Sequence, residues 1–228
     1  MNKKTQFTII FLGLAAFITL GCQIASQVLP TSTPAPTFTP ASTLTPTLTP
    51  TPTPKPDISA AVLTLDDLPA GFEAFALEEL GMSMADFGGE ESFQPENVFI
   101  FINSQNIQMI FGFNFLLTDK LDRVSFDAGV SQPEVIIPAF VSGMGTENVH
   151  DEKVLEGIDD IGGQQIGMTM IAELEGLSMQ VDVLMFRRDI IGEMVMSMTM
   201  EGKKPNITIH DLGLRLDQKA QESLQSLK

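Results

Sequence analysis

The sequence predicts an α+β domain: a mostly antiparallel β-sheet with a short mid-chain helix and a C-terminal amphipathic helix packed on it. Three observations lead to this fold class. Apolar residues alternate with polar ones over several segments within residues 97–200, a period of two that is typical of strands. Very short turns join three of these segments, which makes neighbouring strands antiparallel. Residues 208–227 carry apolar side chains at three- and four-residue steps, as in an amphipathic helix.

Two strands are expected in the first half of the domain. Residues 97–103 are mostly apolar at consecutive positions, which is typical of a central strand with both faces covered. After a turn at 104–106, apolar residues recur at every second position and predict a strand with one core face, carrying Ile107, Met109, Phe111, Phe113, Phe115 and Leu117. Residues 80–96 show no clear periodicity and are expected to form a loop.

A short helix is expected between the two groups of strands. Ser131 and Glu134 have the spacing of a capping box, in which the first side chain caps the helix and the second reaches back. One side of this helix would carry Val135, Ile136, Ala139 and Phe140. Pro138 removes a backbone hydrogen bond, so the helix should be short or kinked and should end at Gly143.

The second half of the domain is expected to be a strand at 153–158, a three-stranded meander at 165–174, 177–187 and 190–200, and a closing helix. Thr208 can cap that helix. The inward faces of the meander would carry Ile166, Met168, Met170 and Leu174, then Leu177, Met179, Val181, Val183 and Met185, then Met194, Met196, Met198 and Met200. The apolar stripe of the helix is Ile209, Leu212, Leu216, Ala220, Leu224 and Leu227.

Composition separates an N-terminal part from one folded domain at 57–228. The chain has 228 residues and a formal charge of −16, and all 29 acidic residues lie at or beyond Asp57. With 10 basic and 29 acidic residues, the domain carries −19, which repels phosphate backbones and argues against nucleic-acid binding. The single cysteine excludes an intrachain disulfide framework and a zinc site built from thiolates.

Residues 1–21 have the pattern of a secretory signal peptide, with Lys3 and Lys4 before an uncharged apolar run. The segment Thr19-Leu20-Gly21-Cys22 that follows resembles the lipobox of bacterial lipoproteins, although Thr19 stands where the family usually has Leu. In that family the cysteine sulfur receives a diacylglyceryl group and the signal peptide is cut before it. The resemblance implies that Cys22 carries acyl chains such as palmitate and anchors the protein to a membrane outside the cytoplasm, in the bacterial cell envelope.

Residues 22–56 are expected to be a lipidated cysteine followed by a disordered stalk. Residues 30–56 contain nine prolines and ten threonines in 27 residues, and this composition cannot build a core. A proline-rich spacer extends ~3.1 Å per residue, so the stalk could hold the domain up to roughly 100 Å from the membrane. Its threonines are candidates for O-linked sugars.

The order of elements is similar to that of the Mog1/PsbP-like fold, in which an antiparallel sheet lies between helices. The residues that carry this resemblance are Leu68-Pro69-Ala70-Gly71-Phe72 near the start, Ile161-Gly162-Gly163 before the meander, and the last helix. The resemblance implies an α/β/α sandwich. Known members of that fold act mainly as binding or assembly factors.

The methionines of the predicted sheet are the most unusual feature, because Met194, Met196, Met198 and Met200 fall on one face of one strand. Three interpretations are open: a core filled with adaptable side chains, an adaptable pocket for a small apolar ligand, and a Cu(I) site of thioethers. Copper sites usually recruit a His or Cys as well, and neither lies near this strand. The pocket face would comprise Met168, Met170, Met179, Met185, Phe111, Phe113 and Phe115.

The sequence offers no catalytic constellation and no phosphate-binding or calcium-loop motif, so no catalytic residue, cofactor or metal is assigned. The pairs His150-Asp151 and His210-Asp211 would need to converge with a third group to form a site. The expected function is therefore that of a membrane-anchored extracytoplasmic lipoprotein whose domain is a non-enzymatic binding or assembly module. The alternative is a carrier or sensor of a small apolar ligand. The expected partners are the membrane, through the lipid, and either an envelope protein or a small apolar ligand.

Overall fold

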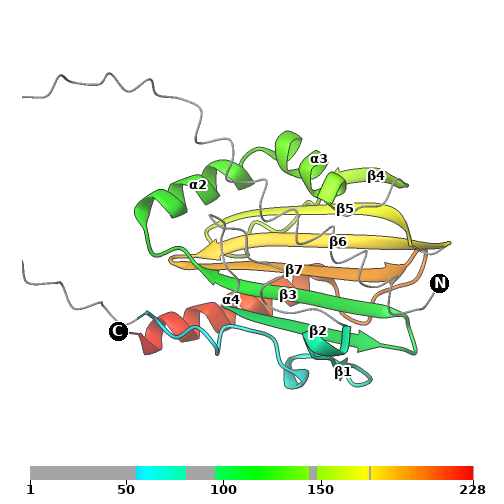
Figure 1. The fold of residues 1–228 in the computed structure, drawn as a ribbon, viewed down its shortest axis with the longest axis horizontal. Helices are drawn as coiled ribbons and strands as arrows, with labels where there is room; N and C mark the ends of the chain where they lie inside the picture. Colours follow the sequence, from blue (N-terminus) through cyan, green and yellow to red (C-terminus); the bar gives the residue numbers. More distant parts are fainter. Residues whose placement is uncertain (1–54, 81–95, 144–147, 175, 228) are drawn as a thin grey trace, which may run out of the picture.

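The computed structural model describes residues 55–80, 96–143, 148–174 and 176–227. Within these ranges it confirms the α+β class, since seven strands form one antiparallel sheet in the order β1-β2-β3-β7-β6-β5-β4 (Figure 1). The strands are β1 (Glu73–Ala74), β2 (Asn97–Asn103), β3 (Gln108–Leu116), β4 (Val149–Val154), β5 (Gln164–Leu174), β6 (Leu177–Arg188) and β7 (Ile191–Met200). The predicted signal peptide, Cys22, nearly all of the stalk and most of the predicted loop at 80–96 lie outside the described residues.

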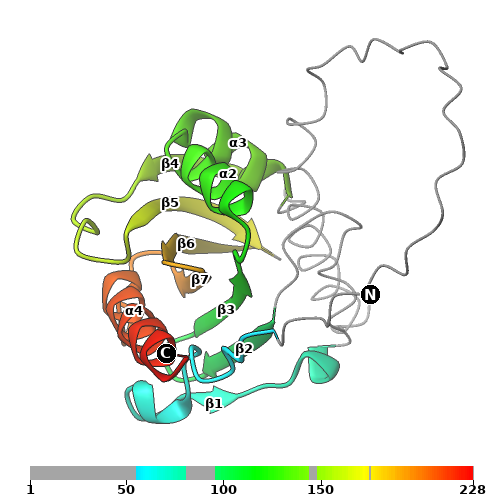
Figure 2. The same cartoon turned by 90° about the vertical axis from the view of Figure 1, so that its left-hand side faces the viewer.

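Helices lie on both faces of the sheet. The helices α2 (Lys120–Val130) and α3 (Pro133–Gly143) pack over β5 and β4, and α4 (Ile209–Ser226) packs on β6 and β7. Figure 2 shows the sheet curving around α4, while α2 and α3 lie outside the curve. Two short 3₁₀ helices, Leu65–Asp67 and Leu77–Leu80, flank β1 on the N-terminal side of β2.

The meander agrees with the sequence prediction to within one residue at each strand end. Its predicted inward face is also confirmed, except that Leu177 is half exposed, and Leu174, Met185 and Met200 lie at the margin of the core. The strand predicted at 153–158 lies instead at Val149–Val154, and Ile158 is buried in the connection that follows. Thr208 caps α4 as predicted, because its side-chain oxygen accepts a hydrogen bond from the Asp211 amide.

Three details of the first half differ from the prediction. Ile107 lies in the β2–β3 turn, with a φ of 53° and a side chain that is 44% exposed, so β3 begins one residue later. Both faces of β3 are covered, because Ile110 and Asn114 on the second face are fully buried. β2 is next to the edge and not central, since β1 pairs with it over two residues.

The mid-chain region contains two helices where one is predicted. Ser131 ends α2 instead of capping α3: its amide and its hydroxyl both donate to the Asp127 carbonyl. α3 continues past Pro138, and Val135 on it is exposed. The residues of the two helices that are buried in the core or packed against it are Phe126, Val130, Ile136, Ile137, Phe140 and Val141.

Two main cores follow from this architecture, one on each face of the sheet. The core on the α2–α3 face contains the methionines and the phenylalanines of β3. The core on the α4 face joins that helix to the N-terminal segment and to the opposite side of the strands, through residues such as Leu63, Phe99, Phe101, Leu184 and Leu212. Because the sheet is covered on both faces, side chains of either parity on β7 are buried, and the period of two in its sequence does not mark a solvent-facing side.

Candidate functional site

The predicted methionine and phenylalanine face is assembled as expected. Cα partners across the sheet include Phe111 with Met196 and Phe113 with Met194. Met168, Met170, Met179, Met194, Met196 and Met198 belong to one cluster with Phe111, Phe113 and Phe115, all at most 8% exposed, and Met185 and Met200 pack at its margin. These side chains therefore form the packed core on the α2–α3 face of the sheet.

The two histidines lie on different elements. His210, on the first turn of α4, contacts Asp160 in the loop before β5, with 3.0 Å between Nε2 and Oδ1. It does not use the adjacent Asp211, whose amide and carboxylate contact Thr208. His150 is exposed on β4. Within the described ranges no group of three or more His, Cys, Asp or Glu side chains could hold a metal ion.

The two edges of the sheet differ in how they are protected. β4 forms one edge, with the charged residues Asp151, Glu152 and Lys153 exposed and a break in register between His150 and Lys153. Charges and bulges of this kind keep an edge strand from pairing with another chain. At the opposite edge, among the described residues, β1 pairs with β2 at Phe101 and Ile102 without a break in register, the Phe75 amide adds a hydrogen bond to Ile100, and the chain then turns into a 3₁₀ helix.

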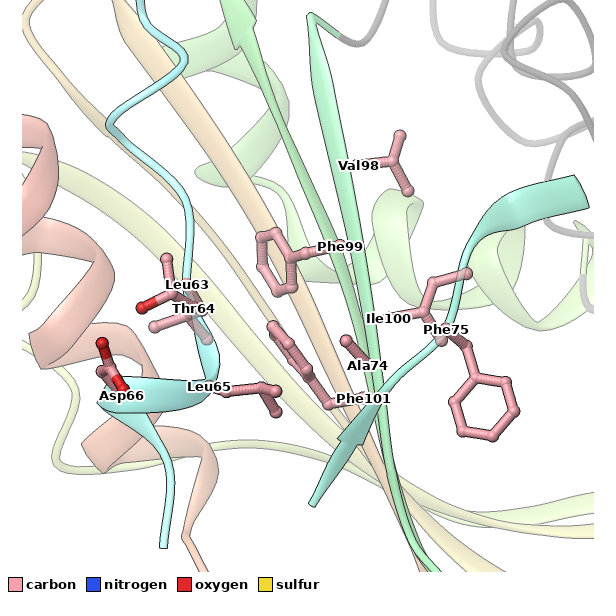
Figure 3. Close-up of a pocket in the computed structure, with 10 residues that line it drawn as sticks. All are labelled: Leu63, Thr64, Leu65, Asp66, Ala74, Phe75, Val98, Phe99, Ile100 and Phe101. Atoms are coloured by element: carbon pink, nitrogen blue, oxygen red, sulfur yellow. The ribbon is translucent and has the colours of Figure 1, made fainter. Parts of the chain in front are cut away.

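A groove of about 460 Å³ lies at this second edge (Figure 3), and we call it the edge groove. Its walls come from the segment before β1, from β1 itself and from β2. The lining residues are Leu63, Thr64, Leu65, Asp66, Ala74, Phe75, Val98, Phe99, Ile100 and Phe101. The sequence marks these segments as apolar, but it gives no sign that they meet, because the contact joins residues far apart in the chain.

One wall of the edge groove is held by a local polar network. The backbone amide and the hydroxyl of Thr64 donate to Oδ2 of Asp67 at 2.7 and 2.8 Å, and Lys219 of α4 forms an ion pair with the same carboxylate. Burial acts to raise the pKa of Asp67, but these hydrogen bonds and the Lys219 charge outweigh it and lower that pKa. The network fixes the turn that presents Leu65, which is 45% exposed.

The floor of the groove is aromatic and buried. Phe99 and Phe101 point to the same side of β2, with ring centroids 5.9 Å apart and an angle of 30° between the planes. Figure 3 shows both rings facing the segment that carries Leu63 and Leu65. Val98 and Ile100 alternate with them and point to the other side of the strand, toward the side of Phe75 (Figure 3).

The rim of the edge groove is acidic. Asp66, Glu73, Glu78 and Glu79 are exposed on the segments that border it. In the described part of the chain, the lysines near this region are in ion pairs, Lys219 with Asp67 and Lys55 with Glu96. The groove thus combines apolar walls with a surplus of negative charge.

A second hollow, of about 370 Å³, lies where the β2–β3 turn meets the loop after β7. It is lined by Gln105, Asn106, Ile107, Met200, Lys203 and Lys204. The Asn106 side chain donates to Asn206 across this junction, and the buried Gln108 ties both segments together through Ser197, Ile207 and Asn206. The hollow is smaller than the edge groove and has no sheet edge beside it.

No family model and no curated protein matches this sequence. In the parts of the chain that the structure describes, no helix combines the length and the apolar character needed to span a membrane.

Proposed function

We propose that this chain is a membrane-anchored lipoprotein of the bacterial cell envelope, and that its domain is a non-enzymatic module that binds a partner protein at the edge groove. The observation that carries the binding role is the groove itself: apolar side chains with Leu65 exposed among them, beside a sheet edge where β1 pairs with only two residues of β2. Apolar recesses at such an edge are typical of protein–protein contact sites.

The filled methionine face supports a protein partner over a small apolar ligand. A carrier needs an enclosed space of a few hundred Å³ inside its core. Here the candidate ligand residues are packed together, with Phe111 and Met168 fully buried. The edge groove, by contrast, lies at the side of the sheet between two chain segments, where another polypeptide can reach it.

The anchor rests on the sequence Thr19-Leu20-Gly21-Cys22 and on the proline- and threonine-rich stalk. Each buried CH₂ of an acyl chain contributes ~0.8 kcal/mol, so two or more chains hold a protein stably at a membrane. Cells that express the full chain and grow on radiolabelled palmitate should label it, and Cys22→Ser should abolish the label. Label that persists in the variant, or none in the unchanged chain, would contradict the anchor.

The binding role can be tested by placing a photoreactive phenylalanine analogue at Leu65 of the full chain in its own cells. Leu177, which is 50% exposed at the start of β6, is the matched control position. We expect one defined protein adduct from position 65 and none from position 177. A lipid adduct at position 65 would favour the carrier, and equal adducts at both positions would refute a specific groove.

A further inference from the structure

Among the described residues, β2 has unpaired backbone groups next to the edge groove. The Phe75 amide donates to the Ile100 carbonyl at 3.0 Å, beyond the two residues that β1 pairs. In an antiparallel strand the backbone groups of alternate residues point to the same edge. The N–H and C=O of Val98 therefore point to the same side as those of Ile100, and among the described residues no backbone group pairs with Val98 there.

The side chains around this open segment fit a strand. A strand places successive side chains on opposite faces of its sheet. Accessible apolar side chains lie on both faces of the edge groove, with Leu65 exposed on one side and Val98 half-buried on the other, beside the buried Phe99, Phe101 and Ile100 (Figure 3). An added strand would thus bury apolar groups on each face, whereas a helix would contact one face and leave the Val98 backbone unpaired.

The acidic rim of the edge groove favours a partner segment with basic residues at its ends. The rim residues Asp66, Glu73, Glu78 and Glu79 are exposed, and the nearby lysines are held in ion pairs. Basic side chains at the ends of an incoming segment would meet this negative rim, and acidic ones would be repelled. The protected β4 edge, with its exposed charges and broken register, offers no equivalent surface.

We propose that the partner of this domain supplies an extended peptide that pairs with β2 at Val98 as an additional strand, with alternating apolar side chains in the edge groove and Lys or Arg at its ends. This inference rests on the proposed function and adds the mode of binding and the chemistry of the ligand. Backbone pairing would supply affinity, and the alternating pockets would supply specificity.

The test begins with a phage-displayed library of random peptides of about eight residues, a length that suits strand addition. The target is the full-length chain in dodecyl maltoside micelles, with Leu65→Arg and Leu177→Arg as the test and matched control variants. We expect enriched peptides that alternate apolar residues, carry basic ends, and bind the Leu177→Arg chain but not the Leu65→Arg chain. Enrichment of acidic or proline-rich peptides, or none that depends on Leu65, would overturn the proposal.

An enriched peptide is then synthesised with N-methyl groups on one or the other set of alternate residues. Strand addition predicts that one set weakens binding by about tenfold or more, because its amides donate to β2, while the other set has little effect. Equal effects of both sets would overturn strand addition. If the photoreactive residue at position 65 still gave a protein adduct in cells, the proposed partner-binding function would be retained and only binding by strand addition would be refuted. Without that adduct, the proposed function itself would fail.

Discussion

The carboxyl group of Glu193 lies in the centre of the sheet, between β7 and α4. The residue is fully buried, and neither side-chain oxygen has a hydrogen-bond partner among the described residues. The neighbouring Asp217 of α4 accepts hydrogen bonds from Arg188 and Gln221. Burial raises the pKa of Glu193 well above its ordinary value, and the charge of Asp217 raises it further. The group is therefore protonated in the folded chain under conditions where it ionises in the unfolded chain.

This difference predicts a stability that falls as pH rises. Because the folded pKa is raised, the stabilisation by the proton is fully present below the ordinary pKa of about 4.3 and is lost as pH rises toward the folded value. Glu193→Gln cannot ionise, so its free energy of unfolding should exceed that of the unchanged chain at pH 8, with the difference shrinking near pH 4. Urea unfolding of both chains at several pH values measures the difference at pH 8 and its decrease toward pH 4.

The exposed Glu156→Gln is the matched control for this prediction, and its unfolding curves should follow those of the unchanged chain. Parallel pH dependences in the Glu193→Gln variant and the unchanged chain would show that Glu193 is not the group responsible.

The alternation of apolar and polar residues along β7 could not reveal the burial of Glu193. Glu193 occupies a position that would face solvent if one side of the sheet were open, and α4 arrives from a distant part of the sequence to cover it.

At the scale of elements, α4 approaches the sheet closely at one glycine. A Cβ atom at Gly213 would lie 2.4 Å from Cδ2 of Leu184 and 2.7 Å from Cδ1 of Ile161. At Gly129 in α2 the nearest atom, Cδ1 of Ile136, would lie 3.9 Å away, which is an ordinary contact. The same substitution should therefore have opposite effects in the two helices.

Gly213→Ala should lower the free energy of unfolding by about 1–3 kcal/mol, because overpacking outweighs the better helix propensity of alanine. Gly129→Ala should raise it by up to about 1 kcal/mol, since only the propensity changes. Chemical denaturation of both variants measures the two effects. A stabilised Gly213→Ala chain would mean that α4 can move away from β6 at little cost.

The elements differ in how far the sequence predicts them. The meander at β5–β7 is predictable because its strands alternate cleanly and its turns are too short for any other connection. The helix α2 is not, because it buries just Phe126 and Val130 while Leu121 and Val124 are exposed, so its apolar residues form no single stripe. The edge groove is equally hidden, since it depends on a non-local contact between residues 63–66 and β2.

For the molecule as a whole, the net charge of −19 over residues 57–228 is the main source of long-range electrostatic repulsion. Like charges on a compact surface repel one another more than in the expanded unfolded chain. Raising the salt concentration from about 0.01 M to about 0.15 M shortens the screening length from ~30 Å to ~8 Å. The thermal unfolding midpoint should rise by about 2–4 °C, which corresponds to roughly 1 kcal/mol for a domain of this size.

Calorimetry in sodium chloride tests this prediction, with glucose at equal osmolality as the uncharged control. Glucose should leave the midpoint nearly unchanged, because it does not screen charge. A midpoint that falls with added salt would indicate that the ion pairs of Arg187 with Asp127 and of Arg188 with Asp217 outweigh the general repulsion.

The strand order has a consequence for how the chain reaches its native state. β3 and β7 are neighbours in the sheet, yet everything from α2 to β6 lies between them in the sequence. A growing polypeptide can close the β5–β6–β7 meander from nearby residues, but the β1–β2–β3 portion has no permanent neighbour until the last strand has been made. Pairing across such a distance is slow because a long loop must close first. During biosynthesis, the hairpin of β2 and β3 is thus the region whose apolar side chains stay exposed longest and most need protection from association with other chains.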